Sequence, residues 1–132
     1  MRKMLIFLLS LLLLLTACSA RSSQTQEQQT QNFGNPTAEE ILKSNPDADL
    51  LQLRNIVYIK AEDNSWVQQE NLGSLQEVGE VQSIYDGNRP FENEMSTKLA
   101  PGTKIYEPTQ HGLIIVAVNN GIEIRYIGLV EG

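Results

Sequence analysis

Few residues of this chain have the types and spacing that catalysis needs. It contains one histidine, His111, and one cysteine, Cys18, among 132 residues. A nucleophilic triad requires a base within hydrogen-bond reach of its nucleophile, and His111 lies beside Gly112 at a predicted turn. The sequence has no G-x-S-x-G, no H-E-x-x-H and no glycine-rich phosphate loop. We therefore expect His111 to be an exposed loop residue, and we expect no Ser or Cys catalysis, no cofactor and no metal centre.

Carboxylates are the remaining groups that could do acid–base chemistry, for example on a glycan. The candidates are Glu77 with Glu80, Glu92 with Glu94, and Asp86. Nothing in their spacing is diagnostic of a hydrolase. The loop at residues 86–92 has oxygen donors for Ca²⁺ but lacks the EF-hand order, so a plain turn is the favoured interpretation. A carboxylate-dependent hydrolase of cell-wall glycan or peptide is therefore the alternative function.

Aromatic side chains could form a different kind of site, a groove that binds a sugar or a peptide. The aromatic candidates are Trp66, Tyr58, Tyr85, Tyr106 and Tyr126. Aromatic residues at strand positions more often belong to the core, which is the competing interpretation. The residues to which we assign ligand binding are Trp66, Tyr85 and Tyr106, together with Asp86 in the adjacent turn.

The N-terminal segment has the features of a secretory signal. Arg2 and Lys3 form a short positive region, and residues 4–15 are apolar except for Ser10. A membrane-spanning helix needs about 20 apolar residues. This run ends sooner, in the small residues Thr16-Ala17-Cys18-Ser19-Ala20. The segment is therefore able to insert into a bilayer but is poorly built to remain there.

The four residues Leu15-Thr16-Ala17-Cys18 resemble the lipobox of bacterial lipoproteins. The resemblance implies cleavage between Ala17 and Cys18, diacylglycerol on the Cys18 thiol and often acylation of the new amino group. Cysteine suits this modification because its nucleophilic thiol forms a thioether. Each buried CH₂ of the acyl chains contributes about 0.8 kcal/mol, so release from the bilayer would be negligible. An ordinary signal peptide with an incidental cysteine, or an uncleaved anchor, is the alternative.

The chain that follows Cys18 is acidic and begins with a polar segment. The formal charge of the whole chain is −6, and removal of residues 1–17 takes away two bases and no acid, which leaves −8. This charge is unfavourable for binding nucleic acid or anionic lipid. Residues 19–36 are rich in Gln, Ser and Thr, which predicts a disordered tether spanning roughly 20–25 Å. A Gln-rich recognition or aggregation segment is the alternative.

Residues 37–132 have the pattern of one small β-rich domain. Thr37 and Glu40 fit a capping box, which predicts a short helix at about residues 38–44. Two β-branched runs, 113–118 and 122–127, flank Asn119-Asn120-Gly121, which predicts a tight hairpin whose first strand is central. Further strands are predicted at 50–53, 56–60 and 76–85 and on both sides of Pro101-Gly102, with a helical turn near Trp66-Val67. We expect a mainly β (α+β) fold: an antiparallel meander of five to seven strands, without parallel crossovers, forming a barrel or half-barrel with one N-terminal helix.

Five short stretches of this domain carry a second resemblance. They are Pro46-Asp47-Ala48-Asp49, Asn55-Ile56-Val57-Tyr58, Val78-Gly79-Glu80-Val81, Leu99 to Tyr106, and Ile122-Glu123-Ile124-Arg125-Tyr126. They are similar to small lipoproteins of Gram-positive bacteria whose role is not established. The resemblance implies a cell type but no substrate and no catalytic residue. We expect a domain on the outer side of the cell membrane that binds an envelope protein or glycan or modulates an envelope process; in a Gram-negative cell, Ser19 favours the outer membrane.

Overall fold

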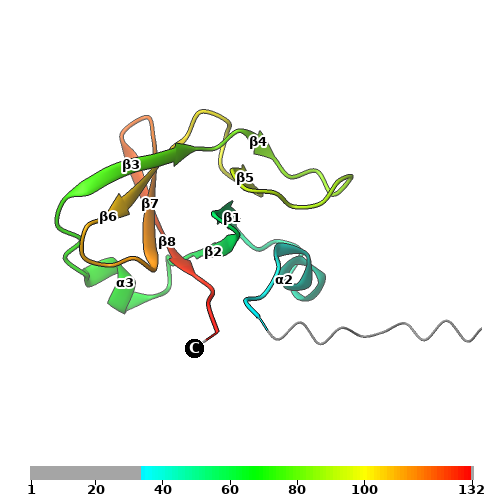
Figure 1. Cartoon of the computed structure of the whole chain (residues 1–132), viewed down its shortest axis with the longest axis horizontal. Helices are drawn as coiled ribbons and strands as arrows, with labels where there is room; N and C mark the ends of the chain where they lie inside the picture. The colour runs from blue at the N-terminus through cyan, green and yellow to red at the C-terminus, as the bar shows by residue number, and fades with distance from the viewer. Residues whose placement is uncertain (1–33, 132) are drawn as a thin grey trace, which may run out of the picture. The chain divides into compact units, whose positions relative to one another are not determined.

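The computed structural model describes residues 34–131. The predicted signal peptide at 1–17, the lipobox with Ala17 and Cys18, and the predicted tether up to residue 33 lie outside the described residues. The described part is mainly β, as predicted: an eight-stranded sheet curls into a half-barrel and carries two short helices (Figure 1). In chain order the elements are α2 (Ala38–Ser44), β1 (Leu50–Leu53), β2 (Ile56–Lys60), α3 (Ser65–Gln69), β3 (Leu75–Glu80), β4 (Ser83–Ile84), β5 (Met95–Ser96), β6 (Lys104–Pro108), β7 (Ile114–Asn119) and β8 (Ile122–Gly128).

The sheet has the strand order β3-β6-β7-β8-β2-β1-β5-β4. Strands β6, β7 and β8 form an antiparallel meander, and the β1–β2 hairpin joins it where β2 pairs with β8. The two edge strands, β3 and β4, are separated in the chain only by Val81 and Gln82. Val81 N–H donates to Thr103 O at 2.9 Å, and Gln82 N–H donates to Glu94 O at 2.8 Å. The chain therefore passes from one edge of the sheet directly to the other, which curls the sheet.

The predicted helix and hairpins are confirmed. The Thr37 hydroxyl accepts from Glu40 N at 3.2 Å while the Glu40 carboxylate accepts from Thr37 N at 2.9 Å, so the capping box starts α2. In the β7–β8 turn, Asn120 and Gly121 have φ of 51° and 77°. A two-residue turn of type I′ needs positive φ at both positions, which Asn and Gly adopt at little cost. Strands β1 and β2 occupy the predicted ranges 50–53 and 56–60.

Several details of the predicted meander are wrong. The sheet has eight strands rather than five to seven. The helical turn predicted near Trp66-Val67 is present as α3. The predicted strand 76–85 is divided into β3 and β4, because the chain bends at Val81 to change edges. No strand precedes Pro101-Gly102 within 97–103; the strand on that side is β5, at Met95–Ser96.

The exclusion of parallel pairing is also wrong, because β4 and β5 are parallel. The loop 85–94 between them folds back on apolar contacts: the rings of Tyr85 and Phe91 lie 4.8 Å apart, and Phe91 is buried beside Ala38 of α2. Glu39 of α2 accepts a hydrogen bond from Phe91 N at 2.7 Å. These contacts return the chain beside β4 in the same direction.

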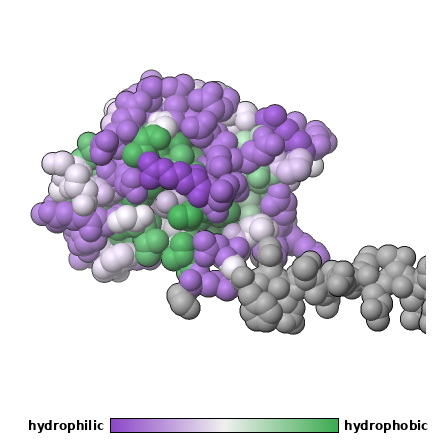
Figure 2. Space-filling model, viewed as in Figure 1, coloured by the Kyte–Doolittle hydropathy of each residue, from purple (hydrophilic) through white to green (hydrophobic). Residues whose placement is uncertain are grey.

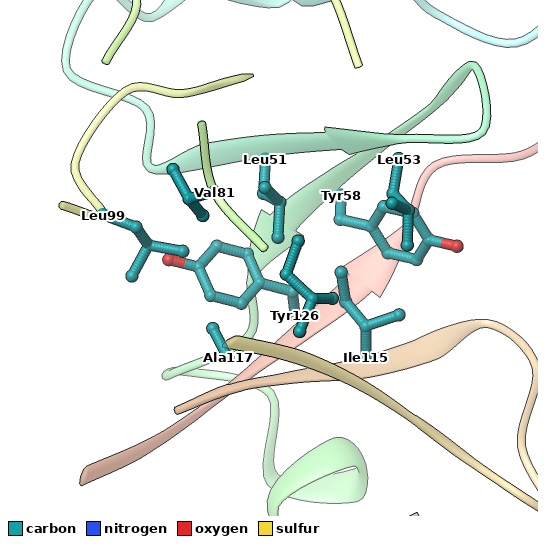
Figure 3. Close-up of a cluster of buried hydrophobic side chains, with 9 residues drawn as sticks. Leu51, Leu53, Tyr58, Val81, Leu99, Ile115, Ala117 and Tyr126 are labelled. Carbon is teal, nitrogen blue, oxygen red and sulfur yellow. The ribbon is translucent and has the colours of Figure 1, made fainter. Parts of the chain in front are cut away.

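The half-barrel interior is filled by side chains from alternate positions of the strands. Ile115 and Ala117 of β7 and Tyr126 of β8 pack with Leu51 and Leu53 of β1 (Figure 3). The remaining members of this cluster are Tyr58, Val81, Leu99 and Ile105. Burial of apolar area at about 25 cal/mol per Å² makes this cluster the main source of the domain's stability.

The helices cover two patches on the outer face of the sheet. Ile114 and Val116, which alternate with the interior residues of β7, pack with Val67 of α3. Leu50 of β1 packs with Ala38 of α2 in a separate cluster. Strand β7 is therefore buried on both faces, which confirms the prediction that it is central.

Buried hydroxyl groups join β1 to β5. The fully buried Ser96 donates to Leu50 O at 2.8 Å and accepts from Leu99 N at 3.1 Å. The neighbouring Thr97 hydroxyl accepts from Leu50 N at 2.8 Å. Leu51↔Ser96 is the single register pair between β1 and β5, and these hydroxyl groups add to the backbone hydrogen bonds from Thr97 N to Leu50 O and from Glu94 N to Gln52 O.

A buried tyrosine also makes a long-range hydrogen bond. Tyr126, fully buried in β8, donates its hydroxyl to Asp49 Oδ1 at 2.8 Å. Burial raises the pKa of Tyr126 well above its ordinary value, and the nearby Asp49 charge and hydrogen bond raise it further. Burial also raises the pKa of Tyr58.

We predict that the domain loses stability above about pH 10. The folded state holds the phenolic proton of Tyr126 more tightly than the unfolded chain, whose tyrosines ionise near pH 10. The stabilising effect is complete below that pH, and it falls by up to about 1.4 kcal/mol per pH unit above it for each such tyrosine. Urea denaturation between pH 8 and about 11.5 measures this slope. Tyr126→Phe is expected to make it shallower, and an unchanged slope would contradict the assignment.

Candidate functional site

The acid pair Glu77 and Glu80 lies on one face of β3 because of a β-bulge. The register of β3 against β6 shifts between Glu77 and Gly79, so residues three apart point the same way. The Lys104 ammonium lies 3.1 Å from Glu77 Oε1 and 2.5 Å from Glu80 Oε2. Hydrogen bonds to these two carboxylates raise the pKa of Lys104. The pair therefore holds a lysine between its carboxylates.

The other carboxylate candidates lie apart from that pair. Asp86 Oδ1 accepts from Asn88 N at 2.9 Å, and this hydrogen bond holds the pKa of the Asp86 carboxyl below its ordinary value. The arrangement is an Asx turn, in agreement with the interpretation of a plain turn. Glu92 is exposed, and Glu94 has a φ of 67° with its N–H donating to Gln52 O at 2.7 Å. Asp86, Glu92 and Glu94 belong to the β4–β5 loop, whereas Glu77 and Glu80 belong to β3.

The single histidine lies in the loop before β7, as predicted, but it is half-buried rather than exposed. His111 Nε2 is 3.0 Å from Glu70 Oε1, at the end of α3. The contact joins the β6–β7 loop to the helix. Within residues 34–131, no group of three or more His, Cys, Asp or Glu side chains is arranged to hold a metal ion.

The four residues predicted to bind a ligand fall into two groups. Trp66 lies on α3 and is 53% exposed, and Tyr106 of β6 packs at the margin of the cluster beneath α3. Tyr85 packs at the margin of the cluster beneath α2, and Asp86 follows it near the start of the β4–β5 loop. These residues therefore do not line one common groove.

The surface carries exposed apolar side chains on several elements. Figure 2 shows hydrophobic residues gathered near the centre of the visible face, with hydrophilic residues around them. The exposed large apolar residues are Trp66, Leu75, Ile84, Leu113, Ile122 and Val130. Ile122, at the start of β8, is the most exposed of them at 65%.

The described surface includes three open hollows of similar size. One of about 450 Å³ adjoins the β6–β7 loop at Pro108 and Gln110, and one of about 440 Å³ lies between α3 and the pair Ile59 and Ile127. The third, of about 300 Å³, we name the β8 slot. It is lined by Lys60, Glu62, Gln68, Ile122, Glu123, Ile124 and Arg125.

The β8 slot exists because β8 is longer than its neighbour β2. The two strands pair only where Tyr58, Ile59 and Lys60 lie opposite Gly128, Ile127 and Tyr126. Ala61 N–H still donates to Arg125 O at 2.9 Å, and the chain then turns away toward α3. On this side of β8, residues 122–124 have no strand partner within the described range 34–131.

The backbone hydrogen bonds of β8 alternate in direction along the strand, and this alternation identifies which backbone groups face the slot. Gly128 N–H donates to Leu113 O at 2.7 Å, so the even-numbered residues of β8 bond to β7. Arg125 O and Leu129 N bond on the opposite side, to Ala61 and Val57. Because the direction alternates along a strand, the N–H and C=O of Glu123 point into the slot.

The wall of the slot is held by Arg125. Its Nη1 donates to Val67 O at 2.7 Å and to Glu70 O at 2.9 Å, two carbonyl groups of α3 and its C-cap. Carbonyl groups at the end of a helix have no partner within the helix, so a cation there stabilises it. Arg125 thereby fastens α3 to β8.

The opposite side of the slot is formed by Lys60 at the end of β2 and by residues that follow it. Lys60 Nζ lies 2.7 Å from Glu62 Oε2, and this hydrogen bond raises the pKa of Lys60. Gln68 donates its side-chain N–H to Ala61 O at 2.8 Å. The charge of Lys60 is therefore already compensated, while Glu123 lies outside every ion pair in the described part of the chain.

Replacing Arg125 by Met is predicted to destabilise the domain by about 2 kcal/mol. The substitution keeps much of the apolar stem but removes two charge-assisted hydrogen bonds to α3. Thermal unfolding followed by far-UV circular dichroism measures the loss. Arg89→Met is the matched control, because exposed Arg89 bonds only to the Ser83 hydroxyl within the described residues. Equal effects of the two substitutions would contradict the role given to Arg125.

Sequence patterns did not identify the β8 slot. The run 122–127 and the run 56–60 were both predicted as strands, yet nothing in either predicts that they pair. The difference in length between β8 and β2 indicates an open edge only when it is known that these two strands pair. No sequence motif includes Lys60, Glu62 or Gln68. They lie at the slot because the chain turns there between β2 and α3.

The described residues define a class of structure: a small, mainly β half-barrel in which the longest strand, β8, has an open edge at residues 122–124. None of its helices, over residues 34–131, is long and apolar enough to cross a membrane. Comparison with known protein families, with curated proteins and with solved structures found no match.

Proposed function

We propose that this chain is a bacterial lipoprotein whose β domain binds a partner in the cell envelope. The signal peptide is removed before Cys18, acyl chains on Cys18 hold the protein on the outer side of the membrane, and the polar tether spaces the domain from the bilayer. Support for the location comes from the lipobox Leu15-Thr16-Ala17-Cys18 and the apolar run before it.

The observation that carries the binding role is the β8 slot. It combines an open hollow of about 300 Å³, backbone groups of Glu123 directed into it, and Ile122 at its rim with 65% exposure. Polar groups beside exposed apolar surface are typical of a recognition site. In contrast, the carboxylates of Glu77 and Glu80 are both paired with Lys104. This pairing favours a binding role for the protein over hydrolysis by these two carboxylates.

Charge restricts the kind of partner. The chain after Cys18 carries a formal charge near −8, which disfavours nucleic acid and other polyanions. A basic or neutral surface on an envelope protein is the complementary partner. Electrostatic attraction would also increase the rate of encounter at low salt.

Copurification from living cells tests the binding role. The full chain, tagged at its C-terminus, is cross-linked in a bacterium and purified in detergent beside Ile122→Lys and Ile84→Lys. Ile84 is 48% exposed on β4, outside the slot, so it is the matched control. A partner retained by the wild type and by Ile84→Lys, but lost with Ile122→Lys, is the expected result. A bait that retains no more protein than an unrelated lipoprotein contradicts the proposal.

A further inference from the structure

The open edge of β8 differs from the two outer edges of the sheet. Edge strands expose unpaired backbone groups, and proteins protect them by bulges, charges and short length. Strand β3 has a bulge and two glutamates, and β4 has only two residues. The edge of β8 at 122–124 is regular, because β8 keeps continuous register with β7 through Ile122. It is therefore the edge best suited to accept another strand.

The β8 slot provides the position that such a strand would occupy. Neighbouring strands lie about 4.8 Å apart, so a segment paired with Glu123 would lie where β2 would continue beyond Ala61. The slot lies at this position, between β8 and the side chains of Glu62 and Gln68. Because β2 ends at Lys60, a space is left beside β8, and polar side chains line the side of this space opposite β8.

Side chains along this edge specify the chemistry of the added strand. Ile122 and Ile124 lie on one face of β8 and Glu123 on the other. A residue opposite Glu123 would lie near its carboxylate, which has no ion-pair partner in the described part of the chain, and the residues on either side would lie toward the isoleucines. Of the other charged residues that line the slot, Lys60 and Glu62 neutralise each other, and Arg125 donates to the carbonyl groups of Val67 and Glu70. Oppositely charged cross-strand pairs and paired apolar residues stabilise a sheet. The complementary segment is therefore a basic residue between two apolar ones.

We propose that the edge of β8 at Glu123 binds an extended peptide segment of a partner protein as an added strand, with a lysine or arginine flanked by β-branched residues. This inference rests on the proposed function and names the partner's chemistry. The peptide backbone bonds to the N–H and C=O of Glu123, and the alternating side chains supply selectivity.

The test uses the full chain in detergent micelles and the blocked, fluorescently labelled peptide Thr-Ile-Lys-Ile-Thr. Fluorescence anisotropy is expected to show saturable binding, and the backbone amide of Glu123 is expected to exchange more slowly with solvent when the peptide is bound. Absence of saturable binding up to millimolar peptide overturns the proposal.

Glu123→Pro removes the N–H that faces the slot. Because this N–H takes no part in the β7–β8 ladder, proline is tolerated there as it is on edge strands. The affinity for the peptide is expected to fall about tenfold or more. Glu123→Ala, which keeps this N–H and removes only the carboxylate, is the matched control and is expected to weaken binding less than Glu123→Pro.

Two further measurements do not depend on the folding of the proline variant. A peptide N-methylated at its lysine cannot donate to Glu123 and is expected to bind about tenfold more weakly. Glu123→Lys is expected to weaken binding of the lysine peptide and to strengthen binding of Thr-Ile-Glu-Ile-Thr. Unchanged affinity for the N-methylated peptide, or the same peptide preference in Glu123→Lys and the wild type, overturns strand addition.

These outcomes are separable from those of the proposed function. If a partner copurifies with the wild type and is lost with Ile122→Lys while every peptide measurement fails, the binding role is supported and binding by strand addition is refuted. Peptide binding without any copurified envelope partner supports the strand edge as a site and contradicts the envelope role.

Discussion

Cys18→Ser is expected to abolish the fatty-acid label and to stop the removal of residues 1–17, so that the chain accumulates as the longer, unlipidated precursor. A serine hydroxyl does not form the thioether that carries diacylglycerol, so both the anchor and the cleavage that follows lipidation are lost. Each CH₂ removed from the bilayer represents about 0.8 kcal/mol, and two acyl chains together hold a protein nearly irreversibly. Because the label and the cleavage both depend on this thiol, the expected change is almost complete rather than graded.

Fractionation and growth with labelled palmitate measure this change in the expressing bacterium. Ser19→Ala is the matched control, because it changes the adjacent residue but keeps the lipobox. The wild type and the control are expected to take up label, to migrate as the shortened form and to sediment with membranes. If Cys18→Ser also sediments with membranes in the shortened, labelled form, the assigned anchor is wrong.

Ser96→Ala is expected to destabilise the domain by about 3 kcal/mol, the largest loss we predict for removal of one polar atom. The Ser96 hydroxyl bonds to Leu50 O and Leu99 N, and all of Ser96 is buried. Without it, the buried Leu99 N–H loses its acceptor, which costs about 1–3 kcal/mol, and Leu50 O keeps only the hydrogen bond from Thr97 N, so the loss of its second bond adds about 1 kcal/mol. The loss should also loosen β5 from β1, which meet at one register pair.

Urea denaturation of the full chain, followed by far-UV circular dichroism, measures the loss. Ser74→Ala removes the same atom at an exposed position and is expected to change stability by less than about 0.5 kcal/mol. Hydrogen exchange is expected to quicken at Leu99 in Ser96→Ala, because that amide loses its acceptor. A free energy of unfolding equal to that of Ser74→Ala would refute the role given to this hydroxyl.

Local patterns predicted the elements that contiguous residues can form alone. Thr37 and Glu40 satisfy each other's backbone groups within one helical turn, so α2 depends little on the rest of the chain. The β7–β8 hairpin is likewise local, since Asn120 and Gly121 adopt positive φ cheaply and the flanking runs are β-branched. The Asx turn at Asp86 also follows from neighbouring residues.

The β8 slot was not predicted from the sequence, because the residues that line it are distant in the chain. The four residues predicted to bind a ligand lie in two places: Trp66 and Tyr106 near the patch of the sheet covered by α3, and Tyr85 and Asp86 near the patch covered by α2. Glu123 was predicted only as the outward residue of a strand. Its open backbone groups result from where β2 ends beside β8, which neither strand's own sequence encodes.

The sequence by itself determined the predicted export signal, the acidic charge, the mainly β class and the local elements, because each depends on composition or on neighbouring residues. Tertiary structure alone decided that the chain bends at Val81, that β4 and β5 run parallel, and that Tyr126 bonds to Asp49. The physical reason is that strand pairing and burial are shared among segments far apart in the chain. Which edges pair, and which edge stays open, depends on the packing of the whole domain.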